Sequence, residues 1–309
     1  MDAVPVCFIE SVLRYSERFF KYDLHKESEQ LSGLWGRIGE FYLQQGGHVI
    51  LLYAPIRGDR NECRLHYQIH GFNHIESRTL CPEVAKKISK TIMSIYLYIR
   101  EGLDGESEWT SINPEDDKGV VNLLMRLEAP SLELNLYPYD REYDSLRLKF
   151  EKLMAKYPQL LRKFTSVELV SLEPPYAKLI QDMVSTGRLQ SIEILGSVPA
   201  ILPTSFWVDY FFSDSCTGLD ATFEDFNVVL EVITRWKEMD PRHLTHIKSF
   251  GGIRASPEAL ADVGLKPDFT EPEHNDVTSF HLIDHPVDPS SFISVTFSKT
   301  FGSLCMCFN

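Results

Sequence analysis

The sequence lacks the features of a secreted, membrane-spanning or nucleic-acid-binding protein. No window is apolar over the roughly 20 residues that a membrane-spanning helix needs. The first residues lack the basic and long apolar regions of a signal peptide, and there is no Asn-x-Ser/Thr acceptor. Clusters of Lys and Arg are missing, and the net charge is −13 with a pI of about 5.2. We therefore expect a cytoplasmic or nuclear protein with no nucleic-acid and no membrane partner.

Cysteine is too sparse and too irregularly placed for a disulfide framework, with six residues in a chain of 309. Reduced thiols are therefore expected. One series, Cys63, His66, His70 and His74, has metal-ligating side chains. On a strand, however, Cys63 would face away from His66 and His70, and residues four apart lie about 13 Å from each other. We therefore predict a solvated polar face and no metal site.

No stretch of the chain carries a catalytic or cofactor-binding motif. There is no Gly-x-Ser-x-Gly, no Gly-x-Gly-x-x-Gly and no Gly-Lys-Ser/Thr after a glycine-rich loop. Ser249 to Gly252 is interpreted as a turn. We predict no catalytic residues and no cofactor, so the chain is not expected to be an enzyme. An enzyme whose site is assembled from scattered residues remains the alternative.

A short template recurs along the first two thirds of the chain. Its six places are apolar, any, Ser, apolar, any and apolar. The four copies are Ile92–Leu97, Ala129–Leu134, Phe164–Leu169 and Leu189–Ile194, at spacings of 37, 35 and 25 residues. Each copy is too short to bury its own apolar face. Stacking of such units along one sheet is how repeat proteins acquire a core.

Helix-period segments between the copies, such as residues 144–162, indicate strand–helix–strand units with parallel strands. The spacing of Leu189, Ile192 and Ile194 resembles the core of a leucine-rich repeat. The predicted fold class is therefore α/β, with a short, irregular, leucine-rich-repeat-like parallel sheet and helices on one face. The strands expected to be parallel and adjacent in this order are 93–99, 131–137, 166–172 and 189–196.

Antiparallel hairpins are predicted at residues 48–71 and 278–298, the second closing the edge of the sheet. Helices are predicted at 203–213 and at 222–239, the latter with Thr222 as N-cap. Trp109 lies in a polar loop. Either a partner contact or packing of this ring against the same chain remains open.

The N-terminal segment, residues 1–45, carries a family resemblance. Apolar residues at helical spacing follow Pro5, and a second apolar series ends at Gly46-Gly47. Val4-Pro5, Ile9, Val12-Leu13, Leu24, Leu31-Ser32 and Trp35 resemble the F-box. The whole opening is similar to the N-termini of nematode F-box-like proteins. Two domains are predicted: an F-box-like helical unit, 1–45, and a repeat-like α/β recognition domain, 46–309.

This resemblance implies a protein-interaction adaptor, the substrate-recognition subunit of an SCF-type ubiquitin ligase. The N-terminal helices would bind a Skp1-like adaptor, and the remainder would bind an unknown protein substrate. The residues implied for Skp1 are Pro5, Ile9, Leu13, Leu31 and Trp35. Two alternatives remain open: the segment only caps the sheet, or the chain is a scaffold with no ubiquitin link.

The fifth place of the template is expected to form an exposed stripe on the sheet. It is occupied by Tyr96, Glu133, Glu168 and Glu193. Equivalent places on neighbouring strands lie about 4.8 Å apart. An acidic stripe of this kind suits a basic partner, unless Lys or Arg side chains of the same chain neutralise it.

Overall fold

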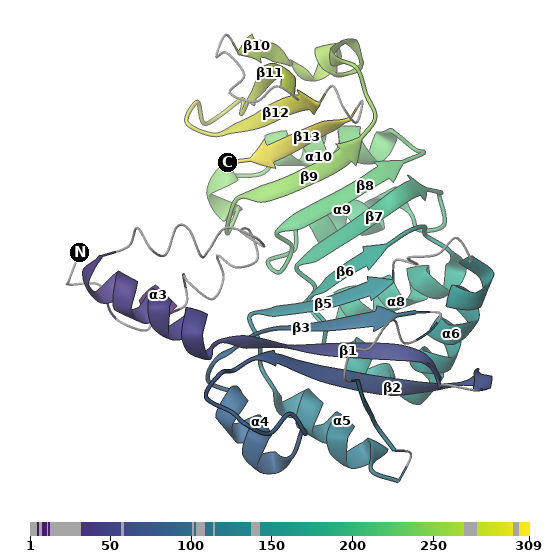
Figure 1. Ribbon diagram of the computed structural model, residues 1–309. Coiled ribbons are helices and arrows are strands. Elements are labelled where there is room, and N and C mark those ends of the chain that lie inside the picture. Colours follow the sequence, from purple (N-terminus) through teal and green to yellow (C-terminus); the bar gives the residue numbers. More distant parts are fainter. Residues whose placement is uncertain are drawn as a thin grey trace. The chain divides into compact units, whose positions relative to one another are not determined.

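The computed structural model describes residues 5, 8–10, 12, 32–56, 59–100, 102, 109–113, 115–136, 143–268, 277–298 and 303–309. The chain forms two compact units, residues 1–164 (unit 1) and 165–309 (unit 2). Each unit is α/β, with a mixed β-sheet and helices (Figure 1). The sequence-based division at residue 45 differs from this one, and most of the predicted F-box-like unit lies outside the described residues.

Unit 1 is built on two parallel strand pairs and an antiparallel hairpin. Its elements are α3 (Gly33–Gln45), β1 (Gly47–Ile56), β2 (Asp59–Gly71), α4 (Pro82–Ile88), β3 (Ile92–Ile99), β4 (Thr110–Ser111), α5 (Asp117–Arg126), β5 (Ser131–Leu136), α6 (Tyr143–Lys156) and α7 (Pro158–Leu161). The strand order is β5-β3-β1-β2-β4. β5 and β1 run parallel to β3, while β2 pairs antiparallel with β1 and β4. Strands β1 and β2 occupy the stretch where a hairpin was predicted.

Unit 2 begins with four parallel strands and ends with antiparallel ones. Its elements are β6 (Ser166–Leu169), α8 (Pro174–Ser185), β7 (Ser191–Val198), α9 (Thr204–Phe211), β8 (Gly218–Phe223), α10 (Asn227–Glu238), η1 (Pro241–His243), β9 (Lys248–Ile253), η2 (Pro257–Val263), β10 (Lys266–Asp268), β11 (Val277–Asp284), β12 (Phe292–Ser298) and β13 (Leu304–Phe308). The strand order is β10-β11-β12-β13-β9-β8-β7-β6. Strands β6, β7, β8 and β9 are parallel to one another. Along the remaining order, β9-β13-β12-β11-β10, each neighbouring pair is antiparallel.

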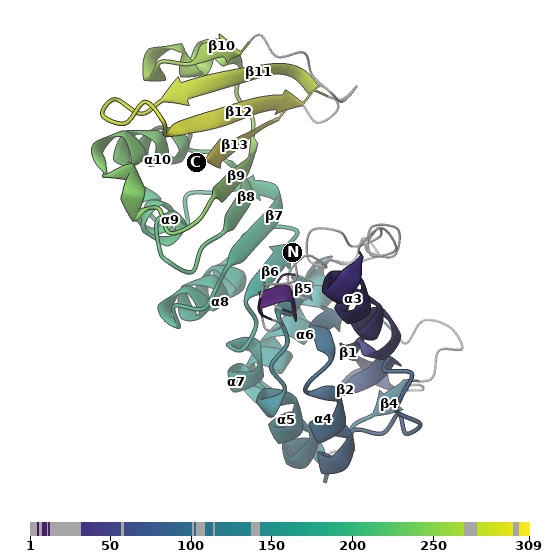
Figure 2. The ribbon, with the colours of Figure 1, turned by 90° about the vertical axis from the view of Figure 1, so that its left-hand side faces the viewer.

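Local sequence explains how the strand–helix units form. In β7, Ile192 and Ile194 are buried while Ser191 and Glu193 face the other side, which is the period of two expected for a strand covered on one face. Helix α8 starts at Pro174, whose missing N–H needs no partner there, and is followed by Gly187 at φ +65°. Figure 2 shows α8, α9 and α10 on one face of the unit 2 sheet.

Two of the predicted parallel pairings are confirmed. β3 pairs with β5 and β6 pairs with β7, both parallel and both with the template residues in register. The predicted neighbours 131–137 and 166–172 fall in different units. The expectation of a parallel sheet holds only for part of each unit, because the hairpin of unit 1 and the last strands of unit 2 are antiparallel.

Three details of the sequence interpretation are wrong in unit 2. Residues 249–252, interpreted as a turn, lie in strand β9, and Thr222 lies in β8 and caps no helix. The hairpin at 278–298 forms as β11 and β12, but it does not close the sheet edge. β10 is the outermost strand and β13 separates the hairpin from β9. At this edge β13 pairs with β9, which is distant in sequence, and local sequence patterns do not specify such a pairing.

Buried cationic side chains bind backbone carbonyls at the end of a helix in unit 1 and in the loop after a helix in unit 2. In unit 1 the Lys163 ammonium donates to the carbonyls of Leu124 and Leu127 at the end of α5. In unit 2 the Lys248 ammonium donates to the carbonyls of Ser213 and Cys216, at 2.8 and 2.5 Å. Lys163 thus supplies a donor to carbonyls at the end of a helix, which have no partner within the helix, and Lys248 supplies one to carbonyls of the loop that follows α9.

Candidate functional site

The polar face of unit 2, opposite its helices, carries equivalent side chains from successive parallel strands. We call a set of residues that are in register across neighbouring strands a level. At the first level Ser166 is in register with Ser191, Ser191 with Gly218, and Gly218 with Ser249. The Ser166 and Ser191 hydroxyls share a 2.6 Å hydrogen bond. In unit 1 the template serines of β3 and β5, Ser94 and Ser131, are likewise in register. The recurring serine therefore marks one level of each sheet.

The acidic row, defined as Glu168, Glu193 and Asp220, lies one level further along the same face. Glu168 of β6 is in register with Glu193 of β7, which is in register with Asp220 of β8. Parallel strands lie about 4.8 Å apart, so the three carboxylates are neighbours. Glu168 is half-buried, and Glu193 and Asp220 are exposed. The row therefore places three carboxyl groups side by side on one face of the sheet.

Asp220 ends the row because the next strand offers it no side chain. Its register partner in β9 is Gly251. A Cβ at Gly251 would lie 2.6 Å from the Asp220 Oδ2, and one at Gly252 would lie 2.6 Å from its Oδ1. The two glycines therefore leave room for the carboxylate to lie over β9. Although the residue as a whole is exposed, the surrounding protein partly desolvates its carboxylate, and this raises the pKa of Asp220 from its ordinary value.

The remaining predicted members of the stripe belong to unit 1. Tyr96 of β3 is in register with Glu133 of β5. Glu133 accepts a 2.8 Å hydrogen bond from the Ser131 hydroxyl, and the Tyr96 ring stacks on Tyr98 with centroids 6.2 Å apart. The structure thus brings Tyr96 and Glu133 together in one unit, and Glu168 and Glu193 together in the other.

His48 and Ser94 form the closest polar pair on this face of unit 1. The His48 Nδ1 and the Ser94 Oγ are 2.6 Å apart. Burial and the charge of His70 lower the pKa of His48, and Glu133 opposes this shift. Only 2% of Ser94 is exposed, so its hydroxyl is not presented to a substrate as a nucleophile would be. We interpret the pair as a structural cross-strand contact.

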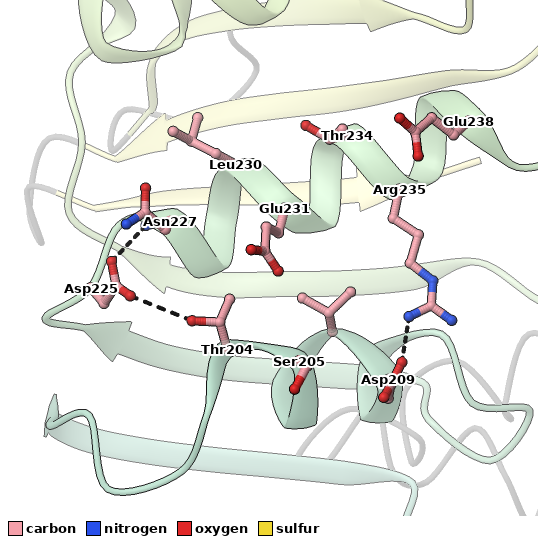
Figure 3. Close-up of a pocket in the computed structure, with 11 residues that line it drawn as sticks. Thr204, Ser205, Asp209, Asp225, Asn227, Leu230, Glu231, Thr234, Arg235 and Glu238 are labelled. Carbon is pink, nitrogen blue, oxygen red and sulfur yellow. Dashed lines mark hydrogen bonds and ion pairs between the residues drawn. The ribbon is translucent and has the colours of Figure 1, made fainter.

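A groove of about 630 Å³ between α9 and α10 is the second polar feature of unit 2 (Figure 3). Its polar groups mostly bind one another. Arg235 reaches Asp209 at 2.5 Å, and the Asp225 carboxylate accepts from the backbone N–H of Asn227 and from the Thr204 hydroxyl. These contacts link α9 to α10 and hold the start of α10. We therefore assign the groove a structural role.

The predicted Skp1-binding residues are described only in part. Pro5 is exposed, Ile9 is completely buried and Trp35 is half-buried in α3, where its ring meets Phe8 edge-on at 6.4 Å. Leu13 and Leu31 lie outside the described residues. Because Ile9 is buried, its side chain contributes to packing, and Pro5 and Trp35 are the described residues of this set that reach the surface. Trp109 is also half-buried.

Within the described ranges, no group of three or more His, Cys, Asp or Glu side chains is arranged to hold a metal ion. The helices found there also include none that is both long and apolar enough to cross a membrane. Comparison with protein-family models, curated proteins and solved structures gives no match. The fold by itself places the chain in the α/β class, with mixed sheets.

Sequence reasoning missed Asp220, the third member of the acidic row. The template accepts Ser in its third place, and Glu stands in the fifth place of three copies. Residues 216–221 fit if Gly218 replaces the serine, and residues 247–252 fit in their first five places, with Gly252 in the sixth, apolar place. The intervals from Ser191 to Gly218 and from Gly218 to Ser249, 27 and 31 residues, match the earlier spacing. Allowing Gly in the third and in the sixth place would have found β8 and β9.

Proposed function

We propose that this chain is a protein-interaction adaptor whose acidic row binds a basic segment of a partner protein. The observation that carries the proposal is the in-register alignment of Glu168, Glu193 and Asp220 on the polar face of unit 2. The three carboxylates are about 4.8 Å apart, whereas Lys or Arg at alternate positions of an extended chain are about 6.6 Å apart, and the long, flexible stems of these side chains allow their charges to reach the row. Charge complementarity of this kind selects partners and speeds association.

The architecture of unit 2 supports a recognition role. Its parallel strands present one side chain each at every level, as the strands of a repeat protein do, and these positions can vary without disturbing the buried face. In this proposal the strand–helix units act as irregular, leucine-rich-repeat-like modules.

The F-box resemblance extends the proposal to ubiquitin transfer. In that version the N-terminal helices bind a Skp1-like adaptor, and the acidic row holds the substrate of an SCF-type ligase. Pro5 and Trp35 support it as residues of the motif at the surface. The test is a pull-down with purified Skp1, comparing wild type with Pro5→Ala and Trp35→Ala. Binding that both substitutions weaken supports the ligase role, and no binding by the folded wild type leaves a scaffold without a ubiquitin link.

The acidic row is tested by selecting displayed random peptides on the folded chain. Peptides enriched in Lys and Arg are expected, and they should lose binding to the row variant, Glu168→Gln with Glu193→Gln and Asp220→Asn. The matched control removes three charges elsewhere in unit 2, through Glu231→Gln, Glu238→Gln and Asp262→Asn. Peptides that bind both variants equally would show that the row is not the binding surface.

A further inference from the structure

Strand β13 carries two free cysteines, Cys305 and Cys307, on one face. Leu304, Met306 and Phe308 point into the core and are at most 1% exposed. The alternate residues, Cys305 and Cys307, are half-buried and therefore reach the polar face. Residues two apart on a strand have Cα atoms about 6.6 Å from each other. This separation is close to the upper limit of the Cα range of about 4.4–6.8 Å that disulfides span, and the Cβ atoms are further apart than the roughly 3.5–4.5 Å that a disulfide needs, so closing the bond requires the strand to bend locally.

The neighbours of the two thiols differ and give them different chemistry. Cys307 is in register with Ser294 of β12 and Ser249 of β9. It is hydrogen-bonded by Cys305 and by Ser294, and these contacts lower the pKa of the Cys307 thiol to about 7. The hydrogen bond to Cys307, burial and the negative charge of Asp220 all raise the pKa of Cys305. Cys307 thus becomes the thiolate, and Cys305 remains its proton-bearing partner.

The bare backbone of Gly251 and Gly252 explains why Asp220 affects Cys305. Cys305 lies in the part of β13 that passes these glycines, between the Leu304–Ile253 and Met306–Phe250 pairs. The Asp220 carboxylate lies over the same glycines. A side chain at either glycine would separate the carboxylate from the thiol. The acid, the two thiols and Ser294 therefore form one cluster drawn from β8, β13 and β12.

We propose that Cys305 and Cys307 are a thiol–disulfide exchange site, with Cys307 as the attacking thiolate and Cys305 as the resolving thiol. The co-reactant is a low-molecular-weight disulfide. Cys307 attacks one of its sulfurs, and the S–S bond breaks to give a mixed disulfide and one released thiolate. Cys305 then loses its proton to solvent and attacks the Cys307 sulfur, which releases the second thiolate. The two cysteines are oxidised to a disulfide and the co-reactant is reduced to two thiols.

The geometry indicates that this disulfide is easily reduced. A bond that joins residues two apart on an extended strand sits near the limit of disulfide geometry, and strained, accessible disulfides are the labile ones. Exchange would therefore be reversible, and it would convert the polar face beside Asp220 from a thiolate-bearing to a neutral surface.

The experiment uses the full folded chain, glutathione disulfide at neutral pH, and mass mapping of the C-terminal peptide. Wild type is expected to form the Cys305–Cys307 disulfide without retained glutathione, and dithiothreitol should reverse it. Cys305→Ser should keep glutathione on Cys307, because the resolving thiol is gone. Cys307→Ser should leave Cys305 reduced. The proposal is overturned if wild type retains glutathione on Cys307, or if both cysteines stay reduced while Cys63 and Cys81 are modified.

A second measurement follows alkylation by iodoacetamide as a function of pH, and its first result comes from wild type alone. Half-maximal reaction of Cys307 is expected near pH 7. Cys216 is the internal reference, since burial raises its pKa to about 11 and it should not react. In Cys305→Ala, which leaves Ser294 as the donor, the Cys307 midpoint should rise toward the ordinary thiol value of about 8.5. The rate at pH 7 should fall by less than the thiolate fraction does, because a more basic thiolate is more nucleophilic. A Cys307 midpoint above 8 in wild type contradicts the assignment.

Discussion

Replacement of Lys248 by Met tests the role of the buried lysine of unit 2. The side chain is 1% exposed, and its ammonium holds the carbonyls of Ser213 and Cys216. Met retains the apolar stem and removes the donor. Each carbonyl keeps one other donor, the Cys216 carbonyl from the His246 Nε2 at 2.8 Å and the Ser213 carbonyl from the Cys216 N–H at 3.3 Å. The substitution therefore removes charge-assisted hydrogen bonds without orphaning a carbonyl, and the expected loss in free energy of unfolding is about 1–3 kcal/mol.

The assay is urea unfolding followed by tryptophan fluorescence. Trp207 and Trp236, at most 1% exposed, report on unit 2. The matched control is Lys178→Met on the exposed side of α8, which should change the free energy of unfolding by less than about 0.5 kcal/mol. If Lys248→Met is as stable as this control, the ammonium does not hold the carbonyls as the structure indicates.

The same pair gives a pH dependence with a defined sign. Burial lowers the pKa of Lys248 below its unfolded value of about 10.4. Between these two values the unfolded chain binds more protons at this site than the folded chain does. The free energy of unfolding of wild type should therefore rise relative to Lys248→Met as the pH increases through this window. A difference that shrinks with increasing pH contradicts the direction of the shift.

Three further predictions concern single contacts. Tyr157→Phe removes a 2.7 Å hydrogen bond to the buried carboxylate of Asp117 and should lower the free energy of unfolding by about 1–3 kcal/mol in urea titration. Gly252→Ala places a Cβ 2.6 Å from a carboxylate oxygen at φ +73° and should lower the melting temperature, whereas Gly119→Ala, with open space in α5, should raise it. Burial raises the pKa of Tyr53 to about 12, so stability should fall as the pH rises from about 10, and less steeply in Tyr53→Phe.

Much of the parallel part of the fold is predictable from the sequence because each strand carries its own signal. The template places Ser94, Ser131, Ser166 and Ser191 correctly, and in each unit the serines are in register. The signal failed at β8 and β9, where Gly218 takes the serine place and glycines replace large side chains in β9. These glycines look like a turn locally, yet they lie in β9, where Gly251 pairs with Asp220 of β8, and the Asp220 carboxylate occupies the space that a side chain would need.

The edges of the sheets and the candidate sites are harder to predict. β13 is inserted between β9 and β12 from the far end of the chain, and no local pattern specifies that pairing. The grouping of Asp220, Cys305 and Cys307 depends on it, so the cluster cannot be seen in the sequence. The acidic row was partly predictable because Glu168 and Glu193 share a template place. Glu133 has the same template place but lies in unit 1, and the template carries no signal for the boundary between the two units.

The most direct test of the adaptor proposal is the affinity of a selected Lys- and Arg-rich peptide, measured by fluorescence anisotropy on wild type, the row variant and the charge-matched control. Each surface charge pair contributes about 0.2–1 kcal/mol, so the three substitutions of Glu168, Glu193 and Asp220 should weaken binding about 3- to 150-fold at about 50 mM salt. Wild-type binding should itself weaken at higher salt, because exposed charges are screened. Equal affinity for the row variant and the control would contradict the claim that this surface recognises the partner.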